Sequence, residues 1–539
     1  MLMTELPDLS IDFLHSSYRA GSLTPADVLA GIRARAATLD DENIWIHLLS
    51  EQQSAAYLAA LAKYTPDELP LYGIPFAIKD NIDLAGVPTT AGCPDYAYTP
   101  GHSASVVERL LRAGALPVGK SNLDQFATGL TGTRSPWGAT RNSFNPAYIS
   151  GGSSSGSAVA VARGLCSFAL GTDTAGSGRV PAAFNNIVGI KPSRGLLSTR
   201  GVVPACRSLD CVTVFSLDCS DAATVLDVVT ASDPDDPYTR RAQPGPPATE
   251  GFRIGVPEAG QLEFFGNHSA ELLYRKTLEQ LLELGGEAVT IDFQPFIDAA
   301  RLLYEGPWVA ERYAAIETFI ETRPASLLPV TRSIIAPGKD ITAVAAFNNS
   351  YRLQALRQQA DRILASVDFV LTPTAGSIYT IDAVNNDPVT LNSQLGYYTN
   401  FMNLLDYAAV AVPAGFHDSG LPFGVTLFAP AFHDTALLQY AARLHHAMQL
   451  PRGATGRFGT SLWQPEHDSS GRSGLVVCGA HLQGLPLNHQ LLERGARLLR
   501  ATRTAPCYRL YALAGGPPFR AGLLRDTDNG AAIEVEVWE

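Results

Sequence analysis

Short apolar runs alternate with helical patterns between residues 71 and 230. Runs of four or five apolar residues bounded by Gly, Pro or Asn are typical of buried strands, and apolar positions at helical spacing lie between them. Alternation of this kind predicts an α/β layer with a mixed sheet. The expected strands are Ile74–Ile78, Ala115–Val118 and Ser167–Leu170, and the expected helices are Val106–Arg112 and Ala158–Arg163.

The flanking regions repeat the two patterns. Residues 1–70 are predicted to be helical, with a helix start at Thr24-Pro25. The Pro- and Asp-rich segment 232–250 is expected to be a surface loop. Beyond it we expect strands at Phe252–Val256, Asp368–Thr374, Ala408–Val412 and Phe423–Phe428, and helices at Ser269–Leu284, roughly Phe296–Thr322, and Thr435–Met448.

The last part of the chain has a different composition. Residues 451–473 are rich in Gly, Ser and charge and are expected to be a linker. Strand patterns begin again at Gly474–Val477 and continue at Tyr508–Ala512 and Ile533–Val537. A tail of this length is marginal as an independent domain. We therefore expect a main domain at 1–450, a linker at 451–473 and a small partial β-containing domain at 474–539.

Composition restricts the range of partners. Only 17% of the 539 residues are charged, so the chain can form a large core, and the net charge of −12 argues against nucleic-acid binding. The same negative charge repels an anionic substrate, which would then need a local Arg or Lys. The N-terminus lacks a basic region and no apolar run reaches 18 residues, so neither a signal peptide nor a membrane span is expected. Seven scattered cysteines without a CxxC pair suggest reduced thiols in the cytoplasm.

The candidate chemistry lies in one lysine and two serine-bearing glycine loops, Gly151–Ser157 and Gly171–Arg179. A serine hydroxyl needs a base, and no histidine lies in or beside these loops. A neutral lysine can serve as the base, and burial lowers a lysine pKa. Lys79 ends the apolar run Ile74–Ile78, which suits this role. A solvated Lys79 paired with Asp80 is the alternative.

The second loop is a run of small residues around Ser177. Its successive N–H groups, from Thr174, Ala175, Gly176 and Ser177, could form an oxyanion hole. A simple glycine turn or a phosphate cradle is the alternative, although no Gly-Lys-Ser/Thr ending is present. The first loop contains G-x-S-x-G around Ser154, the pattern of the α/β-hydrolase nucleophile elbow. That elbow needs a preceding strand, whereas Asn145–Tyr148 is turn-like.

These loops carry a resemblance to a known family. Ser150–Arg179, together with Leu71–Asp83 and Gly119–Gly129, resembles the amidase signature family over roughly residues 5–450. The resemblance implies α/β/α layers around a twisted mixed sheet, an active site in a cleft near the sheet, and a homodimer, with no metal or organic cofactor. It implies a Ser–cisSer–Lys triad in which Lys79 is the base, Ser153, after a cis peptide bond, relays the proton, and Ser177 is the nucleophile.

Within that family, several passages most resemble bacterial allophanate hydrolases. They are Gly132–Pro136, Ser208–Val212, Leu421–Ala431 and, for the C-terminal domain, Cys507–Arg525. This resemblance implies hydrolysis of allophanate, a small anionic amide, with release of ammonia in the second step of ATP-dependent urea degradation. It thereby implies a functional link to urea carboxylase.

The same resemblance suggests residues that recognise the substrate. Arg312 would bind its carboxylate and Tyr304 a polar end, and a spacing of eight places both on one face of the expected helix. The loop at Gly129 would add backbone contacts. Asp173 and Arg179 are expected to orient the nucleophile loop.

Other functions stay open. One is a broad-specificity amidase or the glutaminase subunit of a tRNA amidotransferase, which normally lacks the extension at 475–539. A second is an inactive family member that serves as a scaffold. The third is an α/β-hydrolase esterase, which would depend on Ser154 and a histidine rather than on Lys79.

Overall fold

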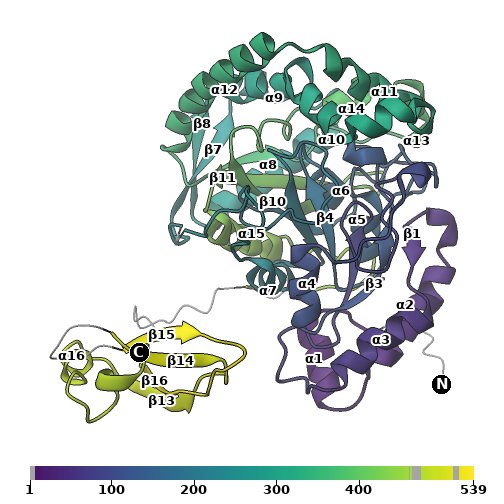
Figure 1. Ribbon diagram of the computed structural model, residues 1–539. Helices are drawn as coiled ribbons and strands as arrows, with labels where there is room; N and C mark the ends of the chain where they lie inside the picture. Colours follow the sequence, from purple (N-terminus) through teal and green to yellow (C-terminus); the bar gives the residue numbers. More distant parts are fainter. Residues whose placement is uncertain (1–6, 244, 460–461, 464–474, 514–520, 539) are drawn as a thin grey trace. The chain divides into compact units, whose positions relative to one another are not determined.

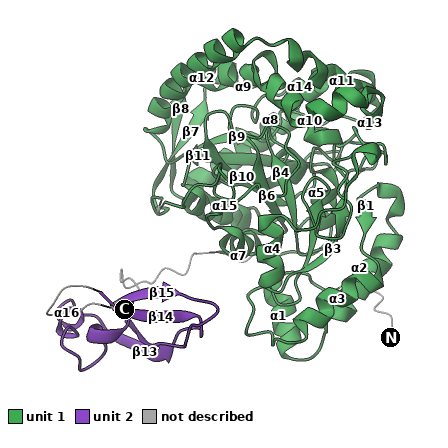
Figure 2. Cartoon of the chain, viewed as in Figure 1, with its two compact units in different colours: residues 1–463 green, residues 464–539 purple. Residues whose placement is uncertain are grey.

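The computed structural model describes residues 7–243, 245–459, 462–463, 475–513 and 521–538. The chain divides into two compact units, residues 1–463 and 464–539 (Figure 2). Each unit is considered by itself.

A single large sheet forms the centre of the first unit (Figure 1). In the described residues it has eleven strands, in the spatial order β1, β3, β2, β4, β6, β5, β10, β11, β9, β7, β8. Their bounds are β1 (Trp45–Leu48), β2 (Pro75–Lys79), β3 (Leu116–Ser121), β4 (Phe168–Asp173), β5 (Val188–Lys191), β6 (Cys211–Ser216), β7 (Phe252–Pro257), β8 (Gly286–Ile291), β9 (Phe369–Pro373), β10 (Tyr407–Phe416) and β11 (Pro422–Pro430).

The sheet is mixed. β2 is parallel to both β3 and β4, and β7 is parallel to β8 and β9, while the remaining neighbours are antiparallel. The expected α/β fold with a mixed sheet is therefore confirmed. Parallel neighbours end at the same edge of a sheet, so residues that follow β2 and β4 lie near one another.

Helices cover the sheet (Figure 1). α15 packs on β10 and β11, α7 on β6, and α5 on β2 and β4. The helices of this unit are α1 (Ile11–Arg19), α2 (Pro25–Ala37), α3 (Glu51–Leu61), α4 (Ser105–Arg112), α5 (Ser155–Ala162), α6 (Val180–Phe184), α7 (Cys219–Val229), α8 (His268–Glu283), α9 (Gln294–Glu305), α10 (Trp308–Thr322), α11 (Pro329–Ile335), α12 (Ala343–Leu364), α13 (Ile381–Asn386), α14 (Thr390–Leu395) and α15 (Asp434–Met448).

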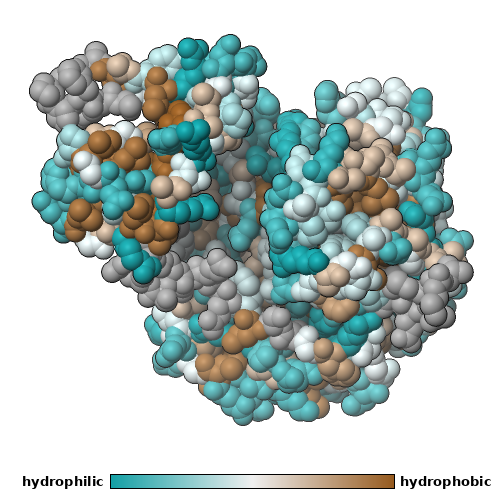
Figure 3. Space-filling model, turned by 90° about the horizontal axis from the view of Figure 1, so that it is seen from below, coloured by the Kyte–Doolittle hydropathy of each residue, from teal (hydrophilic) through white to brown (hydrophobic). Residues whose placement is uncertain are grey.

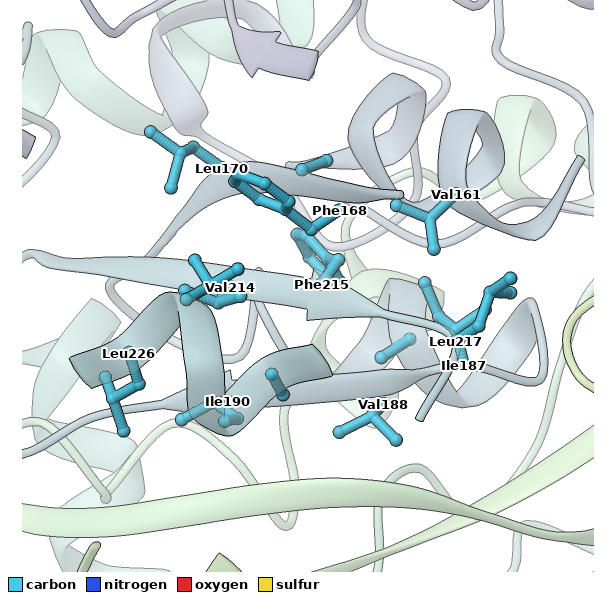
Figure 4. Close-up of a cluster of buried hydrophobic side chains, with 14 of the residues drawn as sticks. Val161, Phe168, Leu170, Ile187, Val188, Ile190, Val214, Phe215, Leu217 and Leu226 are labelled. Atoms are coloured by element: carbon cyan, nitrogen blue, oxygen red, sulfur yellow. The ribbon is translucent and has the colours of Figure 1, made fainter. Parts of the chain in front are cut away.

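The core around β4, β5 and β6 holds the strands that lead to the candidate site (Figure 4). Phe168 on β4, Phe215 on β6 and Val188 on β5 are fully buried. Phe168 also stacks on Phe76 of β2, with ring centroids 5.3 Å apart. Full burial of one such side chain stabilises the fold by about 1.5–3 kcal/mol. The strands that lead to the candidate site are therefore held in a well-packed core.

Two expectations about elements are wrong. Residues 1–70 are not all helical, because Trp45–Leu48 forms β1, a half-buried edge strand antiparallel to β3. The pattern Phe296–Thr322 is two helices rather than one. Gly306 is extended (φ −111°, ψ −167°) and ends α9, and Pro307, which lacks an N–H, precedes α10.

The second unit contains β12 (Leu475–Val477), β13 (Leu498–Arg503) and β16 (Glu534–Trp538) in one sheet, and β14 (Tyr508–Ala512) with β15 (Ala521–Arg525) in another. α16 (His489–Leu492) adds Leu491 to a small core with Val477 and Trp538. The small β-containing part that the sequence predicts is thus present. Large hydrophobic side chains also reach the surface, among them Leu510 and Leu524, and Figure 3 shows hydrophobic patches with hydrophilic residues between them.

The segment expected as a linker is only partly described. Residues 451–459 pack on the first unit, where Gly453 N–H donates to Asn186 O and Ala454 N–H to Ala162 O. Residues 464–473 lie outside the described residues. Within the described part of the chain, no helix is both long and apolar enough to cross a membrane.

Candidate active site

The candidate site lies where β2 and β4 end. Lys79 is the last residue of β2, and Thr172 and Asp173 end the neighbouring parallel strand β4. Ser177 follows in the loop between β4 and α6, and Ser153 lies in the loop before α5. Strand order therefore brings residues almost 100 positions apart to one edge of the sheet.

Lys79 is fully buried, and its amine is held between two hydroxyls. Nζ lies 2.7 Å from Ser153 Oγ and 2.7 Å from Thr172 Oγ1. Burial lowers the pKa of Lys79 to about 7, although Asp124, Asp210 and Asp173 oppose the shift. Asp80 pairs with Lys120 at 2.8 Å instead. A solvated Lys79 paired with Asp80 is thus excluded.

Ser153 is fully buried and follows a cis peptide bond, as the resemblance implies. Its carbonyl accepts from Asp124 N–H at 3.1 Å. Gly152 before it has no room for a side chain, since a Cβ there would lie 2.2 Å from Asp124 Oδ2. The loop thus fits closely against Asp124, and Ser153 Oγ faces the lysine amine.

Ser177 is 3% exposed, and its Oγ donates to the carbonyl of Gly129 at 3.4 Å. It makes no hydrogen bond with Ser153 among the contacts of the described residues. The structure therefore links Lys79 with Ser153 directly, and Ser177 with Gly129.

Asp173 shapes the loop around Ser177. Its carboxylate accepts from Gly176 N–H at 2.8 Å and Gly178 N–H at 3.1 Å, and it forms a two-point ion pair with Arg179 at 2.9 and 3.0 Å. Burial alone would raise the pKa of Asp173, but Arg179 and these hydrogen bonds hold it below its usual value. Asp173 and Arg179 therefore lie where they can orient the loop, as expected.

Only part of the predicted oxyanion hole has free donors. Gly176 N–H is bound to Asp173. Among the described residues, none accepts the N–H groups of Thr174, Ala175 or Ser177. These three donors belong to the loop that carries the Ser177 hydroxyl and are available to a negatively charged oxygen.

Asp210 stabilises the same loop through hydrogen bonds. Its carboxylate accepts from Thr174 Oγ1 and from the N–H groups of Ala205 (2.8 Å) and Cys206 (3.2 Å). Burial raises the pKa of Asp210 to about 6. Asp210 also lines two neighbouring cavities of about 230 and 350 Å³, both of which Arg207 borders. Asp210, which binds Thr174 of the loop, thus also borders open space.

Arg312 and Tyr304 meet, although they lie on different helices. The break at Gly306 places Tyr304 on α9 and Arg312 on α10, so the expectation that they share one helix face is wrong. Arg312 Nη2 still lies 3.5 Å from Tyr304 Oη, and its guanidinium carbon is 5.4 Å from the centre of the Tyr304 ring.

The guanidinium of Arg312 is buried without a matching anion. Arg312 is 2% exposed, Nη1 donates to Thr128 Oγ1 at 3.2 Å, and Nε has no hydrogen-bond partner. No ion pair within 4.0 Å joins Arg312 to a carboxylate of a described residue. Burial alone would lower the pKa of Arg312, but the more distant charges of Asp210 and Glu311, with Tyr304, hold it above its usual value, so the guanidinium stays charged. Such an arginine is suited to bind an anionic ligand.

Ser154 does not resemble a nucleophile elbow. Residues 150–154 form an irregular loop with no strand directly before it. Ser154 Oγ donates to Thr172 O at 3.1 Å and accepts from Thr172 N–H at 3.2 Å, so it fastens the loop to β4. No histidine of the described residues contacts it.

Sequence reasoning gave no role to Asp124, Thr172 or Arg134, all of which touch the site. Asp124 accepts from the N–H groups of Thr131, Gly132 and Arg134. Arg134 is an isolated charge in a run of small residues, and that isolation is the signal that could have indicated burial. Neither Asp124, which lies among polar residues, nor Thr172 carries such a signal. Among the described residues, no group of three His, Cys, Asp or Glu side chains could hold a metal ion.

Comparison with known proteins identifies the family of the chain. The family model described as Amidase matches residues 27–438, and the one described as Allophanate hydrolase C-terminal domain matches residues 473–539. Urea amidolyase from Saccharomyces cerevisiae is 45% identical over 531 residues, which cover 94% of this chain and 29% of that protein. A glutamyl-tRNA(Gln) amidotransferase subunit from Prochlorococcus marinus is 32% identical over 433 residues, covering 73% of this chain and 87% of that protein.

The fold has solved counterparts. A structure of Kluyveromyces lactis allophanate hydrolase superposes with a TM-score of 0.82 at 41% identity and covers 99% of this chain and 90% of that chain. The chain spans less than a third of the length of the urea amidolyases that it matches.

Proposed function

The chain belongs to the amidase family, and from that premise we propose that it hydrolyses the terminal amide of allophanate (urea-1-carboxylate) and releases ammonia. The observation that carries the proposal is Arg312, a buried guanidinium with no carboxylate partner, beside a buried lysine–serine pair. The likeness to urea amidolyase and allophanate hydrolase, and the match of residues 473–539, support the substrate.

The reaction begins with a proton relay. Neutral Lys79 takes the proton of Ser153, which takes the proton of Ser177 as the latter attacks the amide carbon. The carbonyl oxygen becomes negative and accepts from the free N–H groups of Ala175 and Ser177, and Thr174 completes the donor set. The relay returns the proton to the amide nitrogen, and the C–N bond breaks to release ammonia. Water then attacks the acyl-Ser177 ester by the same relay in reverse and leaves N-carboxycarbamate.

Substrate recognition follows from charge. Allophanate carries one carboxylate, and a chain with net charge −12 repels it at long range. Arg312 offers a planar fork for that carboxylate, and Tyr304 Oη offers a hydrogen bond to a polar end. The carbonyl of Gly129, which accepts from Ser177 Oγ, would add a backbone contact beside the reacting atoms.

The glutaminase component of a tRNA amidotransferase is the second candidate, because a protein of that enzyme is 32% identical to this chain. Residues 473–539 favour allophanate instead, since they match the C-terminal domain of allophanate hydrolase. Glutamine therefore belongs among the test substrates.

The deciding experiment is ammonia release from purified protein given allophanate, malonamate, biuret, urea or glutamine. We expect strong turnover of allophanate, complete loss with Ser177→Ala, and about a 10- to 100-fold rise in KM with Arg312→Ala, because a charge-assisted hydrogen bond is lost. Ser333→Ala is the matched serine control and should keep its activity, because Ser333 is exposed on α11 and its Oγ donates only to Val330 O. Turnover of neutral amides that is indifferent to Arg312 would contradict the substrate, and activity that survives Ser177→Ala would contradict the triad.

The finer biology belongs to the same proposal. A urea carboxylase, which makes allophanate from urea, would supply the substrate, and the cytoplasm is the compartment in which we expect the two to act. The free thiols of all seven cysteines suit a reducing compartment.

A homodimer is part of the proposal, and α12 offers a surface for it. Val344, Phe347 and Tyr351 lie on successive turns of one face and are 70, 62 and 67% exposed. Apolar groups exposed in this way are typical of association surfaces. We expect light scattering to give a dimer for the wild-type protein and a monomer for Phe347→Glu/Tyr351→Glu. A double variant that remains dimeric would place the interface elsewhere.

A further inference from the structure

The segment Thr128–Gly129 contacts both the proposed anion-binding residue, Arg312, and the proposed nucleophile, Ser177. Thr128 Oγ1 accepts from Arg312 Nη1 at 3.2 Å, and the next carbonyl, of Gly129, accepts from Ser177 Oγ at 3.4 Å. A group that holds this segment in place therefore helps to position both the anion-binding group and the nucleophile.

A second buried arginine holds that peptide. Arg134 Nη1 donates to Thr128 O at 2.9 Å, and its Nη2 donates at 2.5 Å to Pro388 O, between α13 and α14. Its side-chain stem also lies against Gly129, since a Cβ on that glycine would be 3.1 Å from Arg134 Cδ. The guanidinium thus bridges two segments some 250 residues apart.

Arg134, like Arg312, carries a charge that no ion pair compensates. It is 3% exposed, its Nε has no hydrogen-bond partner, and no carboxylate of a described residue lies within 4.0 Å of its nitrogens. Asp124 lies nearby, but its oxygens bind the backbone N–H groups of Thr131, Gly132 and Arg134. Burial and repulsion by Arg312 lower the pKa of Arg134 more than the attraction of Asp124 raises it, so its charge remains costly. An anion bound between the two arginines would relieve this repulsion and offset the cost of burying Arg134.

We propose that Arg134 is a positioning residue for an anionic substrate: it clamps the Thr128–Gly129 peptide beneath Arg312 and Ser177 and adds a second positive charge to the carboxylate site. This inference rests on the proposed function for the identity of the site. It predicts that the protein binds an anionic amide more tightly than a neutral one, whichever substrate is natural. A lysine cannot replace Arg134, because one ammonium cannot donate in the planar fork that spans two separate carbonyls.

The test measures binding rather than turnover. In the Ser177→Ala protein, calorimetry gives the Kd of malonamate, which is anionic, and of malonamide, its neutral counterpart. We expect the parent to prefer malonamate. Adding Arg134→Met should weaken malonamate about 10- to 100-fold and malonamide less than about twofold. Arg134→Lys, which retains charge, should give an intermediate loss and keeps the test available if the Met variant does not fold.

Arg452→Met is the matched control. Arg452 is 7% exposed but pairs with Asp8 and Asp218, so its loss should affect stability and leave the preference for malonamate unchanged. Equal weakening of both ligands by the Arg134 variants, no weakening, or no preference for malonamate in the parent would overturn the inference. Failure of the wild-type protein to hydrolyse allophanate, with the two Kd values still separated as expected, would overturn the proposed function alone.

Discussion

At the scale of single residues, the site depends on an amine placed where a charge is costly. Lys79 is fully buried and within 2.7 Å of two neutral hydroxyls, while the aspartates that favour its charged form do not touch it. Burial therefore outweighs the surrounding negative charge, and the lysine can be neutral near neutral pH. That property is what a base for Ser153 requires.

The pH dependence of kcat/KM should report this lysine. Since only the neutral amine accepts a proton, activity should fall as pH drops through about 7, where Lys79 becomes protonated, and should level off above it. The pKa of Asp210 is raised to about 6, so this carboxylate becomes protonated as the pH drops through about 6. The fall in activity should therefore be steeper below pH 6. Initial rates of ammonia release between pH 5 and 9 measure the profile.

Removing the amine gives the control for that profile. Lys79→Met should lower kcat by roughly 10²- to 10⁴-fold at every pH, because the base is lost. A profile in the wild-type protein that is flat across pH 6–8 would show that another group is the base.

The site residues that could be predicted from the sequence were found through motifs rather than through composition. The residues alone left Lys79 open between a solvated and a buried state, because an apolar run before a lysine does not reveal which strands flank it. The resemblance supplied Ser153 and Ser177. Arg134 stayed without a role, because its two carbonyl partners, at Thr128 and Pro388, are set by loop packing that no local pattern encodes.

At the scale of elements, a helix break replaces the continuous helix that the pattern suggested. Apolar periodicity continues across residues 296–322, so the sequence pattern concealed the extended Gly306. Short edge strand β1 was missed for a related reason, since its four half-buried residues lie among helical patterns. The apolar first half of β4 was predicted, because both faces of that strand are buried, whereas its polar end, Gly171–Asp173, was not.

The helix break can be tested with Gly306→Ala. A Cβ at Gly306 would lie 2.3 Å from Leu302 O, so the end of α9 must shift and carry Tyr304 with it. We expect about 1–3 kcal/mol lower stability, as for other overpacked sites, and a several-fold higher KM for the anionic substrate. Thermal melting and steady-state kinetics measure the two effects.

Gly260→Ala serves as the comparison, because a Cβ there would contact nothing within 4 Å. If Gly306→Ala lowered the melting temperature and left KM unchanged, the position of Tyr304 would have no part in binding.

At the scale of the whole molecule, every residue of the proposed site lies in the first unit. Lys79, Ser153, Ser177 and Arg312 fall within residues 1–463, and that unit has its own continuous core. The second unit has a small core of its own. We therefore expect the proposed amide hydrolysis to need only the first unit.

A chain that ends at Trp463 should keep this activity. Because compact units with their own cores fold separately, we expect its kcat/KM for ammonia release to stay within roughly twofold of the full chain, with a single cooperative melt. Loss of ammonia release in a shortened chain that melts normally would show that residues 464–539 contribute to the site.

The near-complete burial of Ser177 and Arg312, at 3% and 2% exposure, has a consequence for the tempo of turnover. We expect a ligand held by both groups to be shielded from bulk solvent, so that substrate entry and product escape require movement of the surrounding loops. Each catalytic cycle then includes at least one opening and one closing event, on the microsecond to millisecond scale typical of such motions. We therefore expect the turnover rate to fall as solvent viscosity rises, because viscosity slows the movement of loops and leaves proton transfer unchanged.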